Sequence, residues 1–106
     1  MRIDVQKRKF CVANKTGGLS GSAIKPIALR MVYQVCHAVK IPVIGMGGIA
    51  TINDVLEFIM AGATGIAIGT ANFNNPFVMP EIISELSKYM EENNIETLDE
   101  IRGIVG

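Results

Sequence analysis

Tryptophan is absent from this 106-residue chain, histidine occurs once, and cysteine occurs only twice. The two cysteines, Cys11 and Cys36, form no CxxC pair, which argues against both a disulfide scaffold and a zinc site. Aromatic residues make up 6% of the chain, whereas apolar residues make up 49% and provide ample material for a core. We therefore expect a chain that folds around an apolar core, without disulfides or metal.

The chain also lacks an excess of charge of either sign and a long apolar segment. Its formal net charge is zero, whereas nucleic-acid binding usually shows as a basic excess on one face. No apolar run is long enough to cross a bilayer, and no signal-peptide pattern is visible. We expect a cytoplasmic protein with neither a nucleic-acid partner nor membrane contact.

Helices and strands alternate after residue 23. The first helix starts with Pro26 in its first turn, should end near Lys40, and is predicted to bury one apolar face. That face consists of Ile27, Ala28, Met31, Val32, Val35, Cys36 and Val39. A later helix, starting at Pro80, is predicted to bury Ile82, Ile83, Leu86, Tyr89 and Met90.

Two short segments, Ile41–Met46 and Gly65–Ile68, are predicted to be parallel strands that are buried on both faces. The helix between them should open with a capping box from Thr51 to Asp54 and end at Gly62. A second capping box begins at Thr97 and predicts a last short helix. Alternating strands and helices indicate βαβ units and parallel pairing.

Residues 1–23 differ from the rest and are predicted to be a loop or excursion region. Short strands are expected at Arg2–Val5 and Lys9–Val12, followed by turn-forming residues up to Ser22. Residues 24–106 then follow the order helix, strand, helix, strand, helix. Because two parallel strands cannot complete a sheet and a (β/α)8 barrel takes roughly 250 residues, we expect either self-association or a fragment of a larger barrel.

A pair of small residues follows each predicted strand: Gly47–Gly48, the first glycine turn, and Gly69–Thr70, the second glycine turn. In barrels, the loops after the last two strands often bind phosphate together with a short extra helix, for which Ala71–Asn75 provides the room. Either turn alone is better explained as a simple strand end. Together they favour a phosphate site. The glycine-rich loop Gly17–Gly21 is weak evidence of function by itself.

Several of these motifs resemble, in order, the C-terminal part of the dihydroorotate dehydrogenase family, and most of all its NAD-linked class 1B catalytic subunits. The stretches that carry the resemblance are Ala13–Gly21, Ala23–Ala28, Ile44–Ile49 and Ile68–Phe73. The resemblance spans nearly the whole chain. It implies the last β/α units of an FMN-binding (β/α)8 TIM barrel that oxidises dihydroorotate to orotate in pyrimidine biosynthesis.

The resemblance also implies where FMN would bind. The flavin contacts fall on Gly21, Gly47, Gly48, Gly69 and Thr70, and the last four of these would bind the FMN phosphate. The family's cysteine base and its orotate-binding asparagines belong to earlier parts of the barrel, so no catalytic residue is assigned in this chain. The isolated segment is therefore expected to be inactive. A partner subunit with FAD and an iron–sulfur cluster would pass electrons to NAD, and a homo-oligomer is expected.

Two alternatives stay open at this stage. The chain could be a non-catalytic module that retains only a phosphate or flavin site from another FMN-dependent TIM barrel, or a truncated piece without a function of its own. Outside the glycine turns, Cys36 is interpreted as a packed thiol and His37 as a surface or half-buried residue. Five methionines are interpreted as core filler: Met31, Met46, Met60, Met79 and Met90.

Overall fold

The computed structural model describes all residues from Met1 to Gly106. Its strands are β1 (Ile3–Asp4), β2 (Lys9–Phe10), β3 (Ile44–Met46) and β4 (Gly65–Ala67). Its α-helices are α1 (Lys25–Ala38), α2 (Ile52–Ala61), α3 (Ala71–Asn74) and α4 (Val78–Glu92). Two 3₁₀ turns, η1 (Ser22–Ile24) and η2 (Leu98–Glu100), precede α1 and follow α4.

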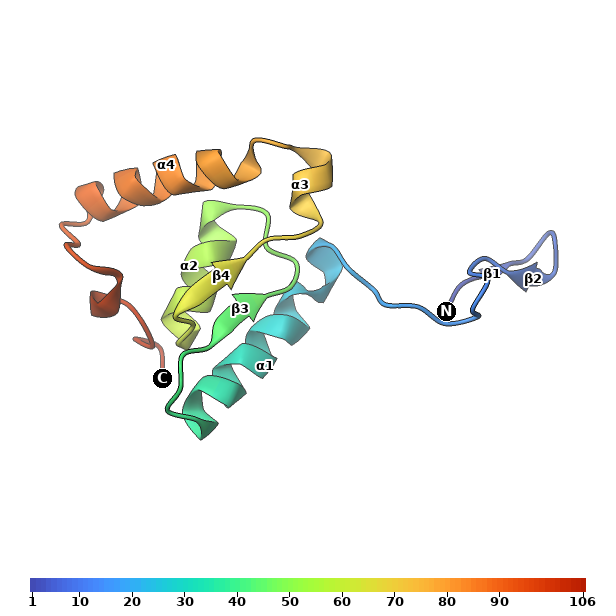
Figure 1. Ribbon diagram of the computed structural model, residues 1–106, viewed down its shortest axis with the longest axis horizontal. Coiled ribbons are helices and arrows are strands. Elements are labelled where there is room, and N and C mark those ends of the chain that lie inside the picture. Colours follow the sequence, from blue (N-terminus) through green and yellow to red (C-terminus); the bar gives the residue numbers. More distant parts are fainter.

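The centre of the molecule is a β3–α2–β4 unit (Figure 1). β3 and β4 pair in parallel, with Ile44 opposite Gly65, as the sequence predicts. Thr51 and Asp54 form the expected capping box at the start of α2. Gly62 ends that helix at a φ of 121°, a backbone region that favours glycine.

Helix α2 covers one face of the two-stranded sheet. A Cβ atom at Gly45 would lie 2.7 Å from the Phe58 ring, so glycine in β3 allows the helix to approach closely. Phe58 is fully buried, and Val55, Ile59 and Ala63 pack in the same cluster. α4 extends this core with Val78 and Ile82, and Ile101 joins it from the C-terminal segment; the cluster of buried residues reaches no further along the chain.

The other face of the sheet is open. Ile44 is 68% exposed and Met46 is 64% exposed, although both belong to β3. The expectation that both faces of this strand are buried is therefore wrong within this chain. Only 14 of the 106 residues are buried. Helix α2 covers one face of the sheet, and no other part of the chain covers Ile44 and Met46 on the opposite face.

The predicted buried face of α1 is wrong for four of its seven members. Ala28, Val32 and Cys36 pack against the core, whereas a parallel apolar row is exposed: Ile27, Met31, Val35 and Val39. The absence of a side chain at Gly62 allows α1 to come close, because a Cβ there would lie 2.8 Å from the Cβ of Cys36. The helix ends at Ala38 with Val39 as its C-cap, close to the expected end near Lys40.

Two further burial predictions are wrong in part. α4 begins at Val78, with Pro80 inside its first turn, and buries Ile82, while the neighbouring Ile83 is 63% exposed. Of the methionines expected in the core, Met60 packs against it. Met31, Met46 and Met79 are exposed instead.

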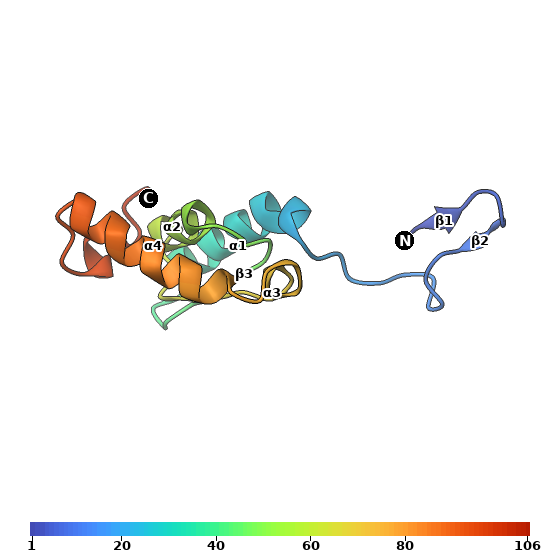
Figure 2. The ribbon, with the colours of Figure 1, turned by 90° about the horizontal axis from the view of Figure 1, so that it is seen from above.

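The N-terminal residues form an antiparallel β1–β2 hairpin that stands apart from the rest of the molecule in both views (Figures 1 and 2). The expected short strands are present, though each has only two residues. The chain from Cys11 to Ser20 is exposed and reaches the helical body only at η1. None of the helices is long and apolar enough to cross a membrane.

Candidate phosphate site

All five residues that the sequence suggests as FMN contacts line one cavity of about 310 Å³. We call it the strand-end cavity, since the turns after β3 and β4 form its floor. Its other walls come from η1 and α3. The lining residues are Ser20, Gly21, Ser22, Ile24, Met46, Gly47, Gly48, Ile49, Ala50, Ala67, Gly69, Thr70, Ala71 and Asn74.

The first glycine turn is tightly enclosed. Gly47 has a φ of 125° and Gly48 a φ of 71°, so both occupy the left-handed region that L side chains rarely adopt. A Cβ at Gly47 would lie 2.6 Å from the Cβ of Ala28. A Cβ at Gly48 would lie 2.8 Å from the backbone nitrogen of Lys25 and 3.0 Å from the carbonyl oxygen of Gly21. Side chains at this turn would therefore collide with the start of α1.

The second glycine turn is open. A Cβ at Gly69 would meet no atom within 4 Å. Thr70 is the N-cap residue of α3, and its side chain makes no capping hydrogen bond. The amide of Asn72 donates to the carbonyls of Ile68 at 2.8 Å and of Gly69 at 3.1 Å, and so fixes the path of the turn. The short helix expected after Thr70 is present as α3.

The strand-end cavity has free hydrogen-bond donors and no charged side chain in its lining. The backbone N–H groups of Gly47, Gly48, Gly69 and Thr70 donate to no other group of the protein. Unpaired backbone N–H groups in glycine-rich turns and at helix N-termini are common partners of phosphate oxygens. No carboxylate is present to repel an anion, so the donor set fits a phosphate group.

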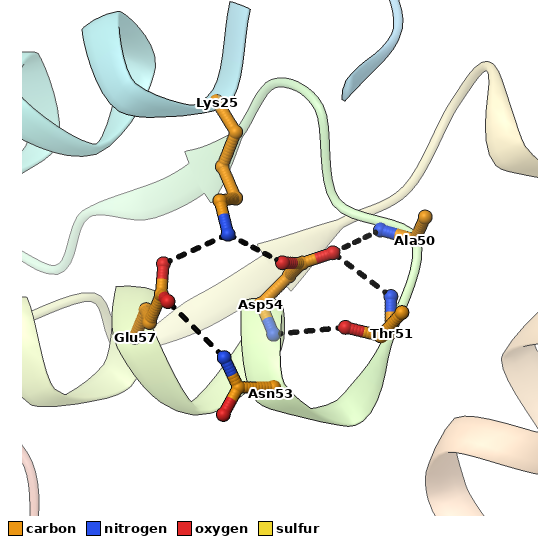
Figure 3. A network of polar contacts seen from close by, with 6 residues as sticks. All are labelled: Lys25, Ala50, Thr51, Asn53, Asp54 and Glu57. Atoms are coloured by element: carbon orange, nitrogen blue, oxygen red, sulfur yellow. Dashed lines mark hydrogen bonds and ion pairs between the residues drawn. The ribbon is translucent and has the colours of Figure 1, made fainter. Parts of the chain in front are cut away.

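A polar network behind the first glycine turn fixes its far end (Figure 3). One carboxylate oxygen of Asp54 accepts hydrogen bonds from the backbone N–H groups of Ala50, at 2.9 Å, and Thr51, at 3.0 Å. The other accepts from the ammonium of Lys25 at 2.6 Å. The same ammonium lies 3.1 Å from a carboxylate oxygen of Glu57.

The charge states of this network are mutually stabilising. Burial favours a higher pKa for Asp54, but the hydrogen bonds from Lys25, Ala50 and Thr51 outweigh it and hold that pKa below its ordinary value. Hydrogen bonds to Asp54 and then Glu57 raise the pKa of Lys25. Both groups are therefore ionised at neutral pH, and Asp54 is a buried charge with full compensation.

Reasoning from the sequence missed several lining residues. Ser20, Ser22 and Asn74 bring two hydroxyls and an amide to the cavity. The two serines flank Gly21 in a loop distant in sequence from both turns, and no local pattern connects them to the strand ends. Cys36 and His37 lie outside the lining; His37 contacts the carbonyl of Gly106 at 2.9 Å instead.

Comparison with known proteins agrees with this architecture. The family model for dihydroorotate dehydrogenase matches residues 1–90. The chain belongs to the dihydroorotate dehydrogenase family. Enzymes of this family are flavin-dependent.

Curated relatives are similar over nearly the whole chain. The catalytic subunit of dihydroorotate dehydrogenase B (NAD(+)) from Lachnoclostridium phytofermentans is 56% identical over 105 residues, which is 99% of this chain and 35% of that protein. Its counterpart from Halalkalibacterium halodurans is 58% identical over 103 residues, covering 97% of this chain and 34% of that protein. The chain thus spans about a third of the length of the relatives it matches.

A solved structure shares the fold. The DHODH of Eimeria tenella, crystallised with ferulenol, superposes with a TM-score of 0.76 at 26% identity. The match covers 86% of this chain and 25% of that one. The arrangement of helices and parallel strands is therefore that of a segment of a dihydroorotate dehydrogenase.

Proposed function

We propose that this chain forms the FMN-phosphate end of an NAD-linked dihydroorotate dehydrogenase, the enzyme that oxidises dihydroorotate to orotate in pyrimidine biosynthesis. The observation that carries the proposal is the convergence of Gly21, Gly47, Gly48, Gly69 and Thr70 on one cavity. Membership of the family supports the reaction. The cavity supports a role for this segment in binding the FMN phosphate. Bound flavin would supply the hydride-accepting chemistry.

The residues of this chain would bind and orient the cofactor. Unpaired N–H groups of the two glycine turns would donate to the phosphate oxygens. Thr70 would add a hydroxyl donor, since its side chain is not used in capping α3. The lining contains no cysteine, histidine or carboxylate, so the base that takes a proton from dihydroorotate would come from residues outside this chain.

The open apolar surface supports placement within a larger barrel. Ile44 and Met46 on the sheet, with Ile27 and Met31 on α1, are each at least 60% exposed. Large apolar side chains exposed to this extent are typical of residues that a neighbouring element or chain covers. We propose that residues 1–106 are the last β/α units of a (β/α)8 barrel domain, with residues 1–23 as an excursion, and that the remaining units cover this surface.

The NAD-linked relatives suggest two partners for the complete enzyme. Electrons would leave through a subunit that carries FAD and an iron–sulfur cluster, and the enzyme would form a homo-oligomer. The name of the relatives, a catalytic subunit, supports a partner subunit, and the exposed apolar surface supports association. The FAD and the iron–sulfur cluster of that partner follow from the family resemblance alone.

The experiment that tests the flavin site compares two ligands that differ only in the phosphate, FMN and riboflavin. In the intact dehydrogenase that contains this segment, Gly69→Val places a branched side chain at the cavity, where no protein atom lies within 4 Å of the new Cβ. We expect FMN affinity to fall at least about tenfold, because one or more charge-assisted hydrogen bonds are lost, while riboflavin affinity changes much less. Flavin titration measures both.

A matched control is Gly18→Val. Gly18 also has open space around its would-be Cβ, but it lies outside the strand-end cavity. This variant should bind both flavins as the wild type does. Unchanged FMN affinity in the folded Gly69 variant would show that the glycine turns do no more than end the strands.

A further inference from the structure

Beyond the residues that face the strand-end cavity, the structure contains an ion pair that connects two of its walls. Lys25 is the first residue of α1 and follows directly on η1, which together with Gly21 forms one wall. Asp54 lies in the first turn of α2, directly after the loop that carries the first glycine turn. The ammonium of Lys25 and the carboxylate of Asp54 are 2.6 Å apart.

The loop from Gly47 to Ala50 contacts both residues of this pair, Lys25 near its start and Asp54 at its end. At its start, Gly48 packs on the backbone of Lys25, since a Cβ there would lie 2.8 Å from the Lys25 nitrogen. At its end, Asp54 accepts the N–H groups of Ala50 and Thr51. The two contacts are joined through the ammonium–carboxylate hydrogen bond (Figure 3).

Neither side chain lines the strand-end cavity. The two side chains contact each other, and that of Asp54 also accepts hydrogen bonds from the loop. The Lys25 side chain is 24% exposed and that of Asp54 is 12% exposed. A positive charge that binds phosphate directly would instead point into the cavity. The pair is thus placed to control backbone position, on which the direction of unpaired N–H donors depends.

We propose that Lys25 and Asp54, the loop clamp, are positioning residues for the FMN phosphate: they fix the N–H groups of Gly47 and Gly48 in the direction of the cavity without touching the ligand. This inference rests on the proposed function of the glycine turns. It adds that the phosphate affinity of the site depends on an ion pair behind the loop.

The test is the ratio of FMN affinity to riboflavin affinity in the intact dehydrogenase. A general loss of stability would weaken both ligands, whereas a displaced loop weakens only the phosphate-bearing one. We expect Lys25→Met and Asp54→Asn each to lower this ratio about tenfold, the effect of losing one charge-assisted hydrogen bond. Lys25→Arg keeps the charge and should restore most of the ratio.

The double variant gives a second readout. If the two residues act as one unit, Lys25→Met combined with Asp54→Asn should lower the ratio little more than either change alone. If Asp54→Asn does not fold, Lys25→Met alone provides the test. Lys25 is the more exposed of the two residues, so its substitution should disturb folding less.

Glu57→Gln is the matched control. Glu57 contacts the same ammonium and the side chain of Asn53, but no backbone group of the loop. This variant should keep the ratio within about twofold of the wild type, below the effect of one lost charged hydrogen bond. A ratio that falls equally in the Glu57 variant would contradict a specific role for Asp54.

The two proposals fail in different ways. If Gly69→Val lowers the ratio and the two loop-clamp variants leave it unchanged, the flavin site stands and the loop clamp has no positioning role. If Gly69→Val itself leaves the ratio unchanged, the phosphate site is wrong, and the loop-clamp proposal is wrong with it.

Discussion

The first and second glycine turns follow neighbouring parallel strands and consist of small residues, yet their surroundings are opposite. Gly47 and Gly48 have positive φ values and are pressed against α1. Gly69 has no atom within 4 Å of its would-be Cβ. The difference teaches that glycine serves backbone geometry and helix packing at the first turn, whereas at the second it leaves room in the cavity.

The means of fixing each turn differ as well. The first depends on a carboxylate, Asp54, which binds two loop N–H groups and a lysine. The second depends on the neutral amide of Asn72, which binds two carbonyls. Only the first turn should therefore respond to pH through its own supporting residue.

Gly47→Val should produce the largest effect and would sharpen the contrast in packing. The new Cβ would lie 2.6 Å from that of Ala28, and the backbone φ of 125° is strained for valine. We expect the free energy of unfolding to fall by at least about 2 kcal/mol, from backbone strain and overpacking together. Urea denaturation of the intact protein measures it. Gly69→Val, the control, should change stability little; equal losses in the two variants would abolish the contrast.

A substitution at Gly48 would act first on the protein itself. A Cβ there would lie 2.8 Å from the backbone nitrogen of Lys25 and 3.0 Å from the carbonyl oxygen of Gly21. Gly48→Val would therefore disturb α1 and the loop before it disturbs a ligand. Gly69 is the position at which the cavity can be filled without that complication.

An intermediate effect is expected from Asp54→Asn, and it should depend on pH. The pKa of Asp54 is lower in the folded state than its ordinary value, so the ionised carboxylate stabilises the fold above about pH 4. That contribution disappears as the pH falls through the folded-state pKa. The wild type should exceed the variant by about 1–2 kcal/mol at pH 7, and the gap should close below about pH 4.

Urea denaturation of both proteins between pH 3 and 7 provides the measurement, with Asn72→Ala as the comparison from the second turn. Asn72 does not titrate, so its gap from the wild type should stay constant over the same range. A gap for Asp54→Asn that widens in acid would have the wrong sign for a carboxylate with a lowered pKa.

Thr70→Val should have the smallest effect. It removes one hydroxyl from the strand-end cavity and leaves the backbone N–H in place, so FMN affinity should fall roughly threefold, as for one neutral hydrogen bond. Thr70→Ser keeps the hydroxyl and should bind like the wild type. A loss as large as that of Gly69→Val would mean that the hydroxyl, rather than the backbone of the second turn, dominates phosphate binding.

Much of the local structure could be predicted from the sequence because it depends on short-range chemistry. The Thr51–Asp54 capping box, the end of α2 at Gly62 and the parallel pairing of β3 with β4 are all confirmed. Apolar burial was predicted less well. Ile44 and the exposed row of α1 are as apolar as the core residues, and periodicity does not indicate which of two apolar rows has a partner.

The sequence by itself determined the order of the elements, their caps and the two small-residue turns, since each depends on residues only a few positions apart. Only the tertiary structure decided that Gly21, more than 20 residues before the first turn in the sequence, shares a cavity with both turns. It also decided that Lys25 reaches Asp54, a partner 29 residues away. Contacts of that separation depend on how α1 packs on the β3–α2–β4 unit, and packing is a property of complementary surfaces rather than of local pattern.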